Sequence, residues 1–266
     1  MTTASEPWVA SYLDLSLVRN IEEASFRAWP ALRTEEMSGW VLRFSNGHTK
    51  RANSVNVLFA DPERDLTAAI DAAEQQYEAA GQPTIFRITP LAEPELEGNL
   101  EARGYGLFDQ TLVMSMPAPA ATIRDPDVLL EPAPGKTWFD GFCRFSPGAA
   151  QQRDTLHTML GRVEGRACYA RIHRDGEPVA FGMSVVEGER AGFFEILVAP
   201  AWRGHGLGRR IMEALIAWAV SDEGAGLLWI QVLADNLPAV SLYRSLGFEA
   251  IYTYRYWQQG TAGRGT

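Results

Sequence analysis

The sequence is poor in cysteine, with two in 266 residues. So few cysteines exclude a small disulfide-rich scaffold. Cys143 and Cys168 could pair, but two cysteines in a chain of this length are more typical of buried thiols in a reducing compartment. The first residues, MTTASEPWVASYLDLSLV, lack the basic head and long apolar core of a signal peptide. We therefore expect a cytoplasmic protein.

Long apolar runs and an excess of positive charge are also missing. No apolar run approaches the ~18–20 residues that span a bilayer, so no membrane partner is expected. The net charge is −9. A nucleic-acid-binding surface needs basic residues to replace counterions, so no nucleic-acid partner is expected either. The negative charge mildly favours cationic partners such as amines, although solubility is its more common reason.

A proline-rich segment, MPAPAATIRDPDVLLEPAPG, spans residues 116–135. Its five prolines disfavour long regular structure, although a short strand is expected at DVLLE. At about 100–200 residues per domain, a chain of this length more often forms two domains than one. We predict domains over residues 1–117 and 135–266, joined by a linker over 118–134.

The second half alternates helical and strand patterns. A helical segment, QQRDTLHTMLGRV, precedes three β-rich runs that are separated by the turn-like tetrads RDGE and EGER. An amphipathic helix over LGRRIMEALIAWAV and a buried strand over GLLWIQVLA follow. A short helix over NLPAVSLYRSLGF is predicted to begin at Asn236 and end near Gly247, and EAIYTYRYWQ reads as a last strand.

The first half repeats this order in a weaker form. A hairpin over GWVLRFSNGHTKRANSVNVLFADP is followed by a helix, a strand, a short helix and a last strand. The segment VNVLFADPERD parallels FEILVAPAWRG, and NLEARGY parallels LYRSLGF. We infer an internal repeat of a whole domain, in which the first copy has ERDLTA in place of the glycines.

A loop rich in glycine and arginine, AWRGHGLGRR, spans residues 201–210. Glycine admits positive φ and lets a ligand approach the backbone closely. The first amides of the helix that follows have no partner within it, and with the helix dipole they favour an anion. Positive charge is added by Arg203, Arg209 and Arg210. The loop therefore predicts a phosphate site rather than a turn without a ligand.

Two common phosphate-binding motifs fail on spacing. The dinucleotide fingerprint G-x-G-x-x-G is one residue longer and belongs to a parallel βαβ unit, whereas the strand before this loop belongs to an antiparallel meander. A Walker loop needs a lysine that is missing here.

Two segments together resemble the signatures of the Gcn5-related N-acetyltransferases. In the first, Arg203, Gly206 and Gly208 match R/Q-x-x-G-x-G/A. The second is a short helix that begins at an asparagine, with matches at Asn236, Leu242, Tyr243, Gly247 and Phe248. The match is strong over residues 165–257. It implies an α/β (α+β) fold in two tandem domains, each with a mixed, mostly antiparallel sheet flanked by helices. The first half resembles the degenerate copy of tandem members.

The resemblance implies that backbone amides of the loop hold the pyrophosphate of acetyl-CoA, and that pantetheine lies along a bulged, splayed strand like an added strand. The residues expected to bind this cosubstrate are Ile196, Leu197, Val198, Arg203, Gly204, His205, Gly206, Leu207, Gly208, Arg209, Asn236, Ala239 and Tyr243.

The reaction implied is direct transfer of acetyl to an amine, which must lose a proton to attack. Tyr243 is the expected general acid for the departing thiolate, and the Val198 N–H is the expected oxyanion donor. Glu195 is the candidate base because a carboxylate inside the apolar run GFFEILV must face a cleft or pair. An ion pair with a basic neighbour, or a water relay with Glu195 positioning the amine, remain alternatives.

Other polar and aromatic residues have weaker patterns. His205 is expected to touch phosphate or solvent, and the scattered histidines predict no metal. Some aromatic residues could line an acceptor pocket, although aromatic strand faces more often form core. These are Trp202, Tyr252, Tyr254, Tyr256 and Trp257. The polar segment TKRANS, residues 49–54, is expected to be a hairpin edge packed on the other domain, with the substrate cleft as the alternative.

Three functions are compatible with these patterns. The first is an N-acetyltransferase for a small-molecule or peptide amine, as a monomer or homodimer, whose N-terminal copy shapes the acceptor site. The second is a CoA-binding sensor or scaffold without turnover. The third is a structural pairing of two copies. The glycine loop together with Tyr243 favours the first.

Overall fold

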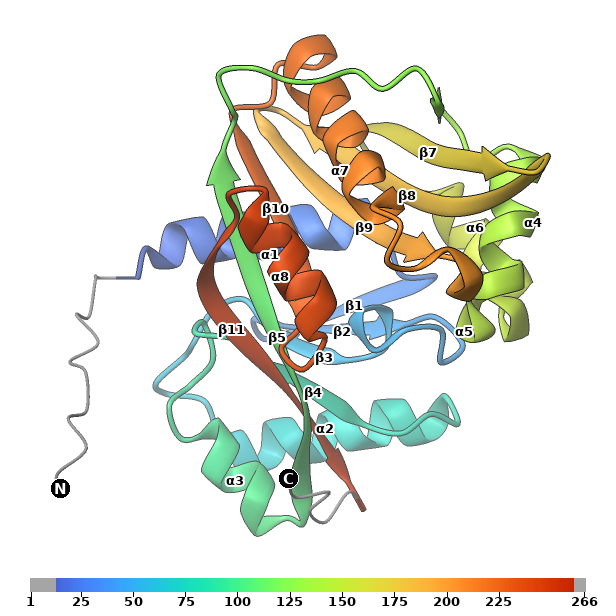
Figure 1. Cartoon of the computed structure of the whole chain (residues 1–266). Helices are drawn as coiled ribbons and strands as arrows, with labels where there is room; N and C mark the ends of the chain where they lie inside the picture. The colour runs from blue at the N-terminus through green and yellow to red at the C-terminus, as the bar shows by residue number, and fades with distance from the viewer. Residues whose placement is uncertain (1–12, 261–266) are drawn as a thin grey trace, which may run out of the picture.

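The computed structural model describes residues 13–260, which form one sheet of eleven strands with helices on both faces (Figure 1). The strand order is β1-β2-β3-β4-β11-β5-β10-β9-β8-β7-β6. The first five strands along the chain are β1 (Arg33–Met37), β2 (Trp40–Phe44), β3 (Val55–Val57), β4 (Ile85–Ile88) and β5 (Tyr105–Pro117). The others are β6 (Val128–Glu131), β7 (Arg166–Arg174), β8 (Glu177–Glu187), β9 (Arg190–Val198), β10 (Leu227–Leu233) and β11 (Glu249–Gln259).

The helices follow the apolar periodicities of the sequence. Those of the first half are α1 (Leu15–Ala28), the short 3-10 helix η1 (Lys50–Ala52), α2 (Leu66–Ala79) and α3 (Leu96–Ala102). The second half contains α4 (Lys136–Phe145), α5 (Pro147–Gln151), α6 (Arg153–Leu160), η2 (Pro200–Trp202), α7 (Leu207–Ala217), the π-helical turn η3 (Trp218–Asp222) and α8 (Leu237–Ser245). The expected hairpin, meander and helices are confirmed, whereas α1 and α4 had no counterpart among the expected elements.

The two halves of the chain exchange their last strands. The C-terminal strand β11 lies between β4 and β5 of the first half, and β5 in turn lies between β11 and β10. All three of these strand pairings, β4 with β11, β11 with β5 and β5 with β10, are antiparallel. The mixed α/β architecture is as expected, while the division into two domains and the internal repeat stay predictions. The strands that precede residues 118–134 in the chain and those that follow them belong to one continuous sheet.

Three apolar clusters form the core on the two faces of the sheet. Val113 and Met114 are neighbours on β5, and because strand side chains alternate, they enter different clusters. The first cluster packs α1, α4 and α6 on one face, including Trp29, the C-cap residue of α1, against Phe194 of β9 with ring centroids 6.3 Å apart. The second packs α7 and α8 on the other face, and the third packs α2 and α3. Helix α1 therefore ties the first half to β9.

The proline-rich segment is held to α7 by charge. Arg210 of α7 pairs with Asp125 at 2.5 Å and with Asp127 at 2.7 Å. The expected short strand is β6, which pairs with β7 at the edge of the sheet. The two cysteines are free and buried, so the expected thiols are confirmed.

Candidate active site

A gap opens in the sheet where β9 and β10 separate. Their parallel ladder ends with Phe193 opposite Ile230, although β9 continues to Val198. Beyond Phe193, β9 stays paired only with β8 among the described residues. This is the splayed strand that the resemblance implied. One edge of its last residues can accept an extended ligand in place of a strand.

A bulge on β9 marks the beginning of this gap. The β8–β9 register shifts between Phe181 and Met183, so that two residues of β9, Glu195 and Ile196, face one of β8. Glu195 has a φ of 53°, which non-glycine residues seldom adopt. A bulge bends its strand and redirects side chains, as is common near functional sites. The Glu195 side chain does not line the cavity described below, but it lies near enough to Tyr243 of α8 to affect the pKa of that hydroxyl.

The glycine loop leads from β9 into α7. Gly204 and Gly206 have φ values of 79° and 75°, and Gly206 is the N-cap residue of α7. A Cβ atom added at either glycine would meet nothing within 4 Å. The backbone conformation, rather than crowding, therefore requires glycine here. Because Gly206 has no side chain to cap α7, the first amides of the helix stay available to an anion.

Helix α8 closes the other side of the gap. The Asn236 side chain accepts a hydrogen bond from the Ala239 N–H at 3.3 Å, which confirms it as the N-cap. Tyr243 is buried with 5% exposure, and its ring packs against Phe248. Burial raises the pKa of Tyr243, and the Glu195 carboxylate raises it further, so its hydroxyl stays protonated.

These elements enclose a cavity of about 400 Å³. Most residues expected to bind the cosubstrate line it, and the exceptions are Leu197 and His205. The His205 Nδ1 lies 3.0 Å from the Arg203 carbonyl oxygen. Trp202, proposed as an acceptor-pocket residue, lines this cavity instead. The lining consists of Ile196, Val198, Trp202, Arg203, Gly204, Gly206, Leu207, Gly208, Arg209, Asn236, Pro238, Ala239, Leu242 and Tyr243.

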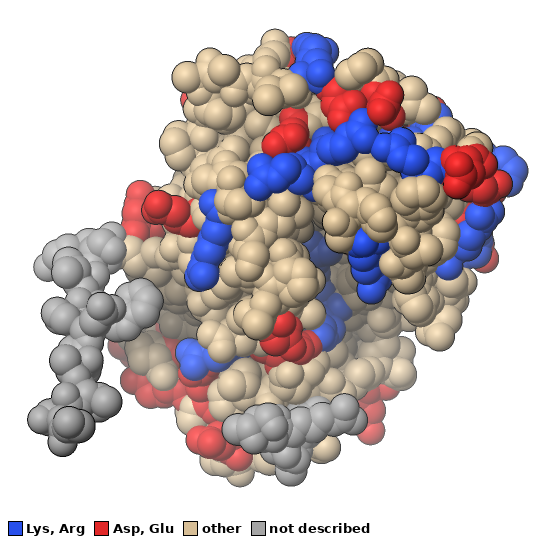
Figure 2. Space-filling view, in the orientation of Figure 1, with Lys and Arg blue, Asp and Glu red and all other residues tan. Residues whose placement is uncertain are grey.

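The charge of this cavity is positive. Arg203 and Arg209 line it, and no carboxylate does. The third arginine of the loop, Arg210, is held by the proline-rich segment and does not line the cavity. Figure 2 shows Lys and Arg side chains gathered in the upper half of the view, which carries α7.

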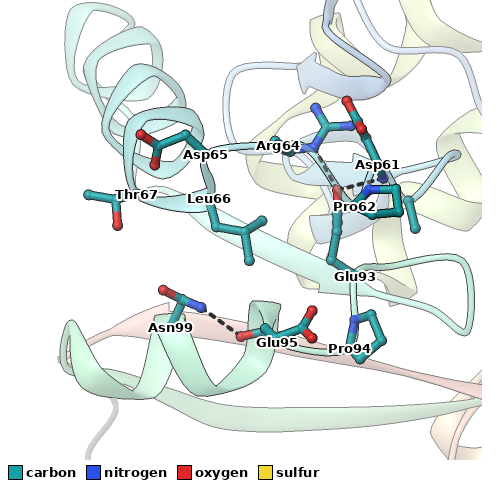
Figure 3. Close-up of a pocket in the computed structure, with 11 residues that line it drawn as sticks. Asp61, Pro62, Arg64, Asp65, Leu66, Thr67, Glu93, Pro94, Glu95 and Asn99 are labelled. Carbon is teal, nitrogen blue, oxygen red and sulfur yellow. Dashed lines mark hydrogen bonds and ion pairs between the residues drawn. The ribbon is translucent and has the colours of Figure 1, made fainter.

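The corresponding region of the first half, at the start of α2, has the opposite charge. Its cavity of about 600 Å³ contains four carboxylates and one arginine (Figure 3). Arg64 is neutralised by Glu93 at 2.6 Å. The Asp65 carboxylate accepts a hydrogen bond from the Ala68 N–H, so the N-terminus of α2 is capped by the side chain of its N-cap residue. An anion would be repelled here. The carboxylates are those of Asp61, Asp65, Glu93 and Glu95.

Glu195 pairs with an arginine from the other half of the chain. The Arg51 Nη2 lies 3.2 Å from the Glu195 Oε1, and the two side chains are 22% and 18% exposed. The ion pair expected as an alternative is therefore present. Burial raises the pKa of Glu195 above its ordinary value, while Arg51 opposes this shift. The segment TKRANS thus both packs on the other half and reaches the site. Its polar content was the only signal for Arg51 in the sequence.

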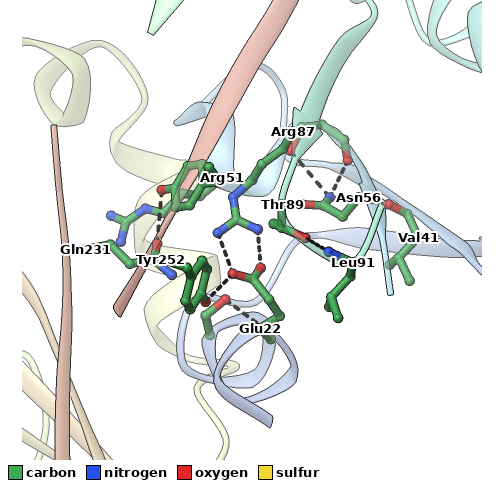
Figure 4. Close-up of polar contacts among 12 residues, drawn as sticks. Glu22, Val41, Arg51, Asn56, Arg87, Thr89, Leu91, Gln231 and Tyr252 are labelled. Atoms are coloured by element: carbon green, nitrogen blue, oxygen red, sulfur yellow. Dashed lines mark hydrogen bonds and ion pairs between the residues drawn. The ribbon is translucent and has the colours of Figure 1, made fainter. Parts of the chain in front are cut away.

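A second cavity, of about 290 Å³, lies where η1 faces β5, β10 and β11. Of the tail aromatics, Tyr254 and Tyr256 line it. Tyr252 instead donates a hydrogen bond to Glu22 at 2.6 Å (Figure 4). The Trp257 Nε1 donates to Glu97. The lining consists of Thr49, Lys50, Arg51, Thr111, Gln231, Leu233, Tyr254 and Tyr256.

Within residues 13–260, no group of three or more His, Cys, Asp or Glu side chains could hold a metal ion. The helices of this part of the chain are also too short or too polar to cross a membrane.

Comparisons with known proteins agree with this geometry. A family model described as "Probable histone acetyltransferase Rv0428c C-terminal" matches residues 15–257. "Uncharacterized N-acetyltransferase YobR" of Bacillus subtilis (strain 168) is 29% identical over 245 residues, which cover 90% of this chain and 97% of that protein. "[Ribosomal protein bS18]-alanine N-acetyltransferase" of Escherichia coli (strain K12) is 35% identical over 94 residues, covering 35% of this chain and 63% of the relative.

A solved structure shares the fold of the whole chain. The GCN5-related N-acetyltransferase from Kribbella flavida superposes with a TM-score of 0.70 at 14% identity, over 92% of this chain and 96% of the other. The family match spans both halves of the chain, and the splayed strand, glycine loop and α8 stand in the arrangement that the resemblance implied. The chain belongs to the Gcn5-related N-acetyltransferases, within the family of the Rv0428c C-terminal region, and is an acetyltransferase of that type.

Proposed function

We propose that this protein transfers acetyl from acetyl-CoA to a primary amine of a small molecule or peptide. The observation that carries the proposal is the convergence of three elements on one cavity. The unpaired end of β9, the glycine loop at α7 and the helix α8 with Tyr243 all line it. The printed name of the Escherichia coli relative, an alanine N-acetyltransferase, supports an amine as acceptor.

The residues of the cavity fit the chemistry of acetyl-CoA. Free amides at the start of α7, with Arg203 and Arg209 beside them, suit a pyrophosphate. The open edge of β9 at Ile196 and Val198 suits the amide groups of pantetheine. Acetyl-CoA supplies an acyl group activated as a thioester. In the transfer, a C–N bond forms, the C–S bond breaks, and the amine gives up one proton.

Glu195 is the proposed group that receives this proton, directly or through a water molecule. Its raised pKa places it nearer to neutral pH, where a base is both deprotonated and effective. Burial favours the protonated form of Glu195, and Arg51 opposes this effect by favouring the ionised carboxylate. Arg51 is therefore a positioning residue that the N-terminal half contributes to the site.

Two groups are proposed to stabilise developing negative charge. The Val198 N–H is expected to donate to the acyl oxygen. Tyr243 is expected to donate its proton toward the departing sulfur. Its raised pKa makes it a weaker acid than an ordinary thiol, whose pKa is about 8.5, so hydrogen-bond donation rather than complete transfer carries the stabilisation.

The test combines a binding and a turnover measurement on the full chain. Acetyl-CoA should raise the melting temperature, and amines should release free thiol from it. The Tyr243→Phe variant should keep the rise in melting temperature but lose kcat by about 100-fold or more. Tyr105→Phe, which removes a hydroxyl bonded to Glu74 far from the cavity, is the matched control and should keep kcat.

Two results would count against the proposal. A protein that acetyl-CoA stabilises but that releases no thiol with any amine is a sensor rather than an enzyme. A protein that acetyl-CoA does not stabilise, and that shows no turnover, has no such site.

A further inference from the structure

The second cavity is built by both halves of the chain, and one of its lining residues, Arg51, pairs with the proposed base Glu195. Thr49, Lys50 and Arg51 come from the segment around η1, and the remaining lining comes from three strands of the sheet. Arg51 belongs to the lining and also pairs with Glu195. A molecule in this cavity therefore contacts Arg51, the ion-pair partner of the group that is proposed to receive the amine proton.

The lining of this cavity offers hydrogen-bond donors and no carboxylate. Lys50 and Arg51 are cationic, and the other polar members carry hydroxyl or amide groups. Carboxylates do surround the site, because Asp109 pairs with Lys50 and Glu195 pairs with Arg51, but neither carboxylate lines the cavity. A cavity with this lining favours an anionic group that accepts hydrogen bonds.

Gln231 presents a donor that lacks a partner. The Tyr254 hydroxyl donates to the Gln231 Oε1 at 3.1 Å, which orients the amide. The Gln231 Nε2 is buried and has no hydrogen-bond partner among residues 13–260. Leaving a buried donor unsatisfied is costly, so an oxygen atom of a ligand is its natural partner.

The two cations are held in place by aromatic rings and by carboxylates that do not line the cavity. The Lys50 Nζ lies 4.8 Å from the ring centre of Phe108, and it pairs with Asp109. The Arg51 guanidinium lies 5.2 Å from the Trp29 ring. Burial lowers the pKa of Lys50 below its ordinary value, and Asp235 opposes this shift. An ammonium has three donors and a guanidinium five, so each keeps N–H groups for a ligand.

We propose that this cavity binds a carboxylate of the acceptor, so that the preferred substrate is an amine that also carries a carboxylate. Lys50, Arg51 and the Gln231 Nε2 would bind the carboxylate oxygens, while the amine faces Glu195. This inference rests on the proposed acetyl transfer and adds the class of acceptor to it. The cavity is at the small end of the range for ligand sites, which suits a molecule of amino-acid size.

The experiment uses acceptors that differ in the carboxylate alone. Acetyl transfer is measured for amino acids beside their decarboxylated amines: lysine with cadaverine, ornithine with putrescine, and tyrosine with tyramine. Peptides and other amines complete the panel. We expect kcat/KM to favour the carboxylated member by about tenfold or more, the usual range for hydrogen bonds to a charged group.

Variants at the cavity test which residues cause this preference. Lys50→Gln should bring the ratio of the two kcat/KM values to within about threefold of one. Asp109→Asn should raise the ratio, because it frees Lys50 from its ion pair. Lys136→Gln removes an exposed lysine that pairs with Asp140 away from the cavity, and as the matched control it should leave the ratio unchanged.

The outcomes separate this proposal from the proposed function. Turnover with a ratio at or below one, or turnover only with amines that lack a carboxylate, overturns the carboxylate site and leaves acetyl transfer standing. A wild-type preference that Lys50→Gln does not change, in a variant with an unaltered melting temperature, also overturns it. Absence of turnover with every amine overturns the proposed function itself, and this inference falls with it.

Discussion

Two exposed glycines allow the energetic cost of positive φ in the α7 loop to be measured separately from any steric clash. Gly206 caps α7 with a φ of 75°, while Gly98 lies within α3, where its φ is outside the left-handed region. At both positions an added Cβ would meet nothing within 4 Å. Substitution by alanine therefore adds no clash at either, and the two differ in backbone conformation alone.

Gly206→Ala should destabilise the protein and Gly98→Ala should stabilise it. A left-handed conformation costs an alanine about 1–2 kcal/mol, whereas replacing glycine in a helix by alanine gains about 0.5–1 kcal/mol. At about 2–4 °C per kcal/mol for a chain of this size, the melting temperature should fall by about 2–8 °C in the first variant and rise by about 1–4 °C in the second.

Differential scanning calorimetry of the two variants and the wild type, without ligand, measures both shifts. Shifts of the same sign would refute the reasoning, because they would show that the φ of Gly206 does not decide the cost. A rise in melting temperature for Gly206→Ala would refute it most directly.

Two further predictions concern ion pairs, one between the halves of the chain and one within the first half. Arg51→Met should move the acidic limb of the pH profile of kcat/KM to higher pH, because the pKa of Glu195 rises once its positive partner is gone. Arg51→Lys should largely restore the position of this limb. A shift of the limb to lower pH in Arg51→Met would contradict the pairing. Glu22→Gln leaves the buried Arg87 uncompensated, so stability should fall by about 3–5 kcal/mol in urea unfolding. Asp222→Asn, which breaks an exposed pair, should cost at most about 1 kcal/mol, and equal losses in these two variants would contradict the role of burial.

The local elements of the active site could be read from residue order because each depends on short-range chemistry. Positive φ at Gly204 and Gly206 and the cap at Asn236 are properties of a few consecutive residues. The loop, α7 and α8 therefore follow from the chain itself. The helix α1 also had a readable signal, since Val18, Ile21 and Ala28 recur on its buried face.

Contacts between distant residues could not be read in this way. Arg51 and Glu195 are separated by 144 positions, and no local pattern relates them. Likewise, the apolar and aromatic alternation of β11 predicted a strand but not its neighbours. Its place between β4 and β5 also depends on interactions such as the Tyr252 hydroxyl with Glu22, 230 positions away.

The sequence by itself therefore determined the glycine-rich loop, its helix and the helix of Tyr243, because caps, glycine conformations and amphipathic periods act within one or two turns. Only the tertiary structure decided that β11 joins the sheet of the first half and that η1 reaches Glu195. The physical reason is that strand pairing and the cost of burying a charge depend on residues that are distant in the sequence and become neighbours only in the folded protein. The part of the site that is proposed to face the acceptor was decided at that level.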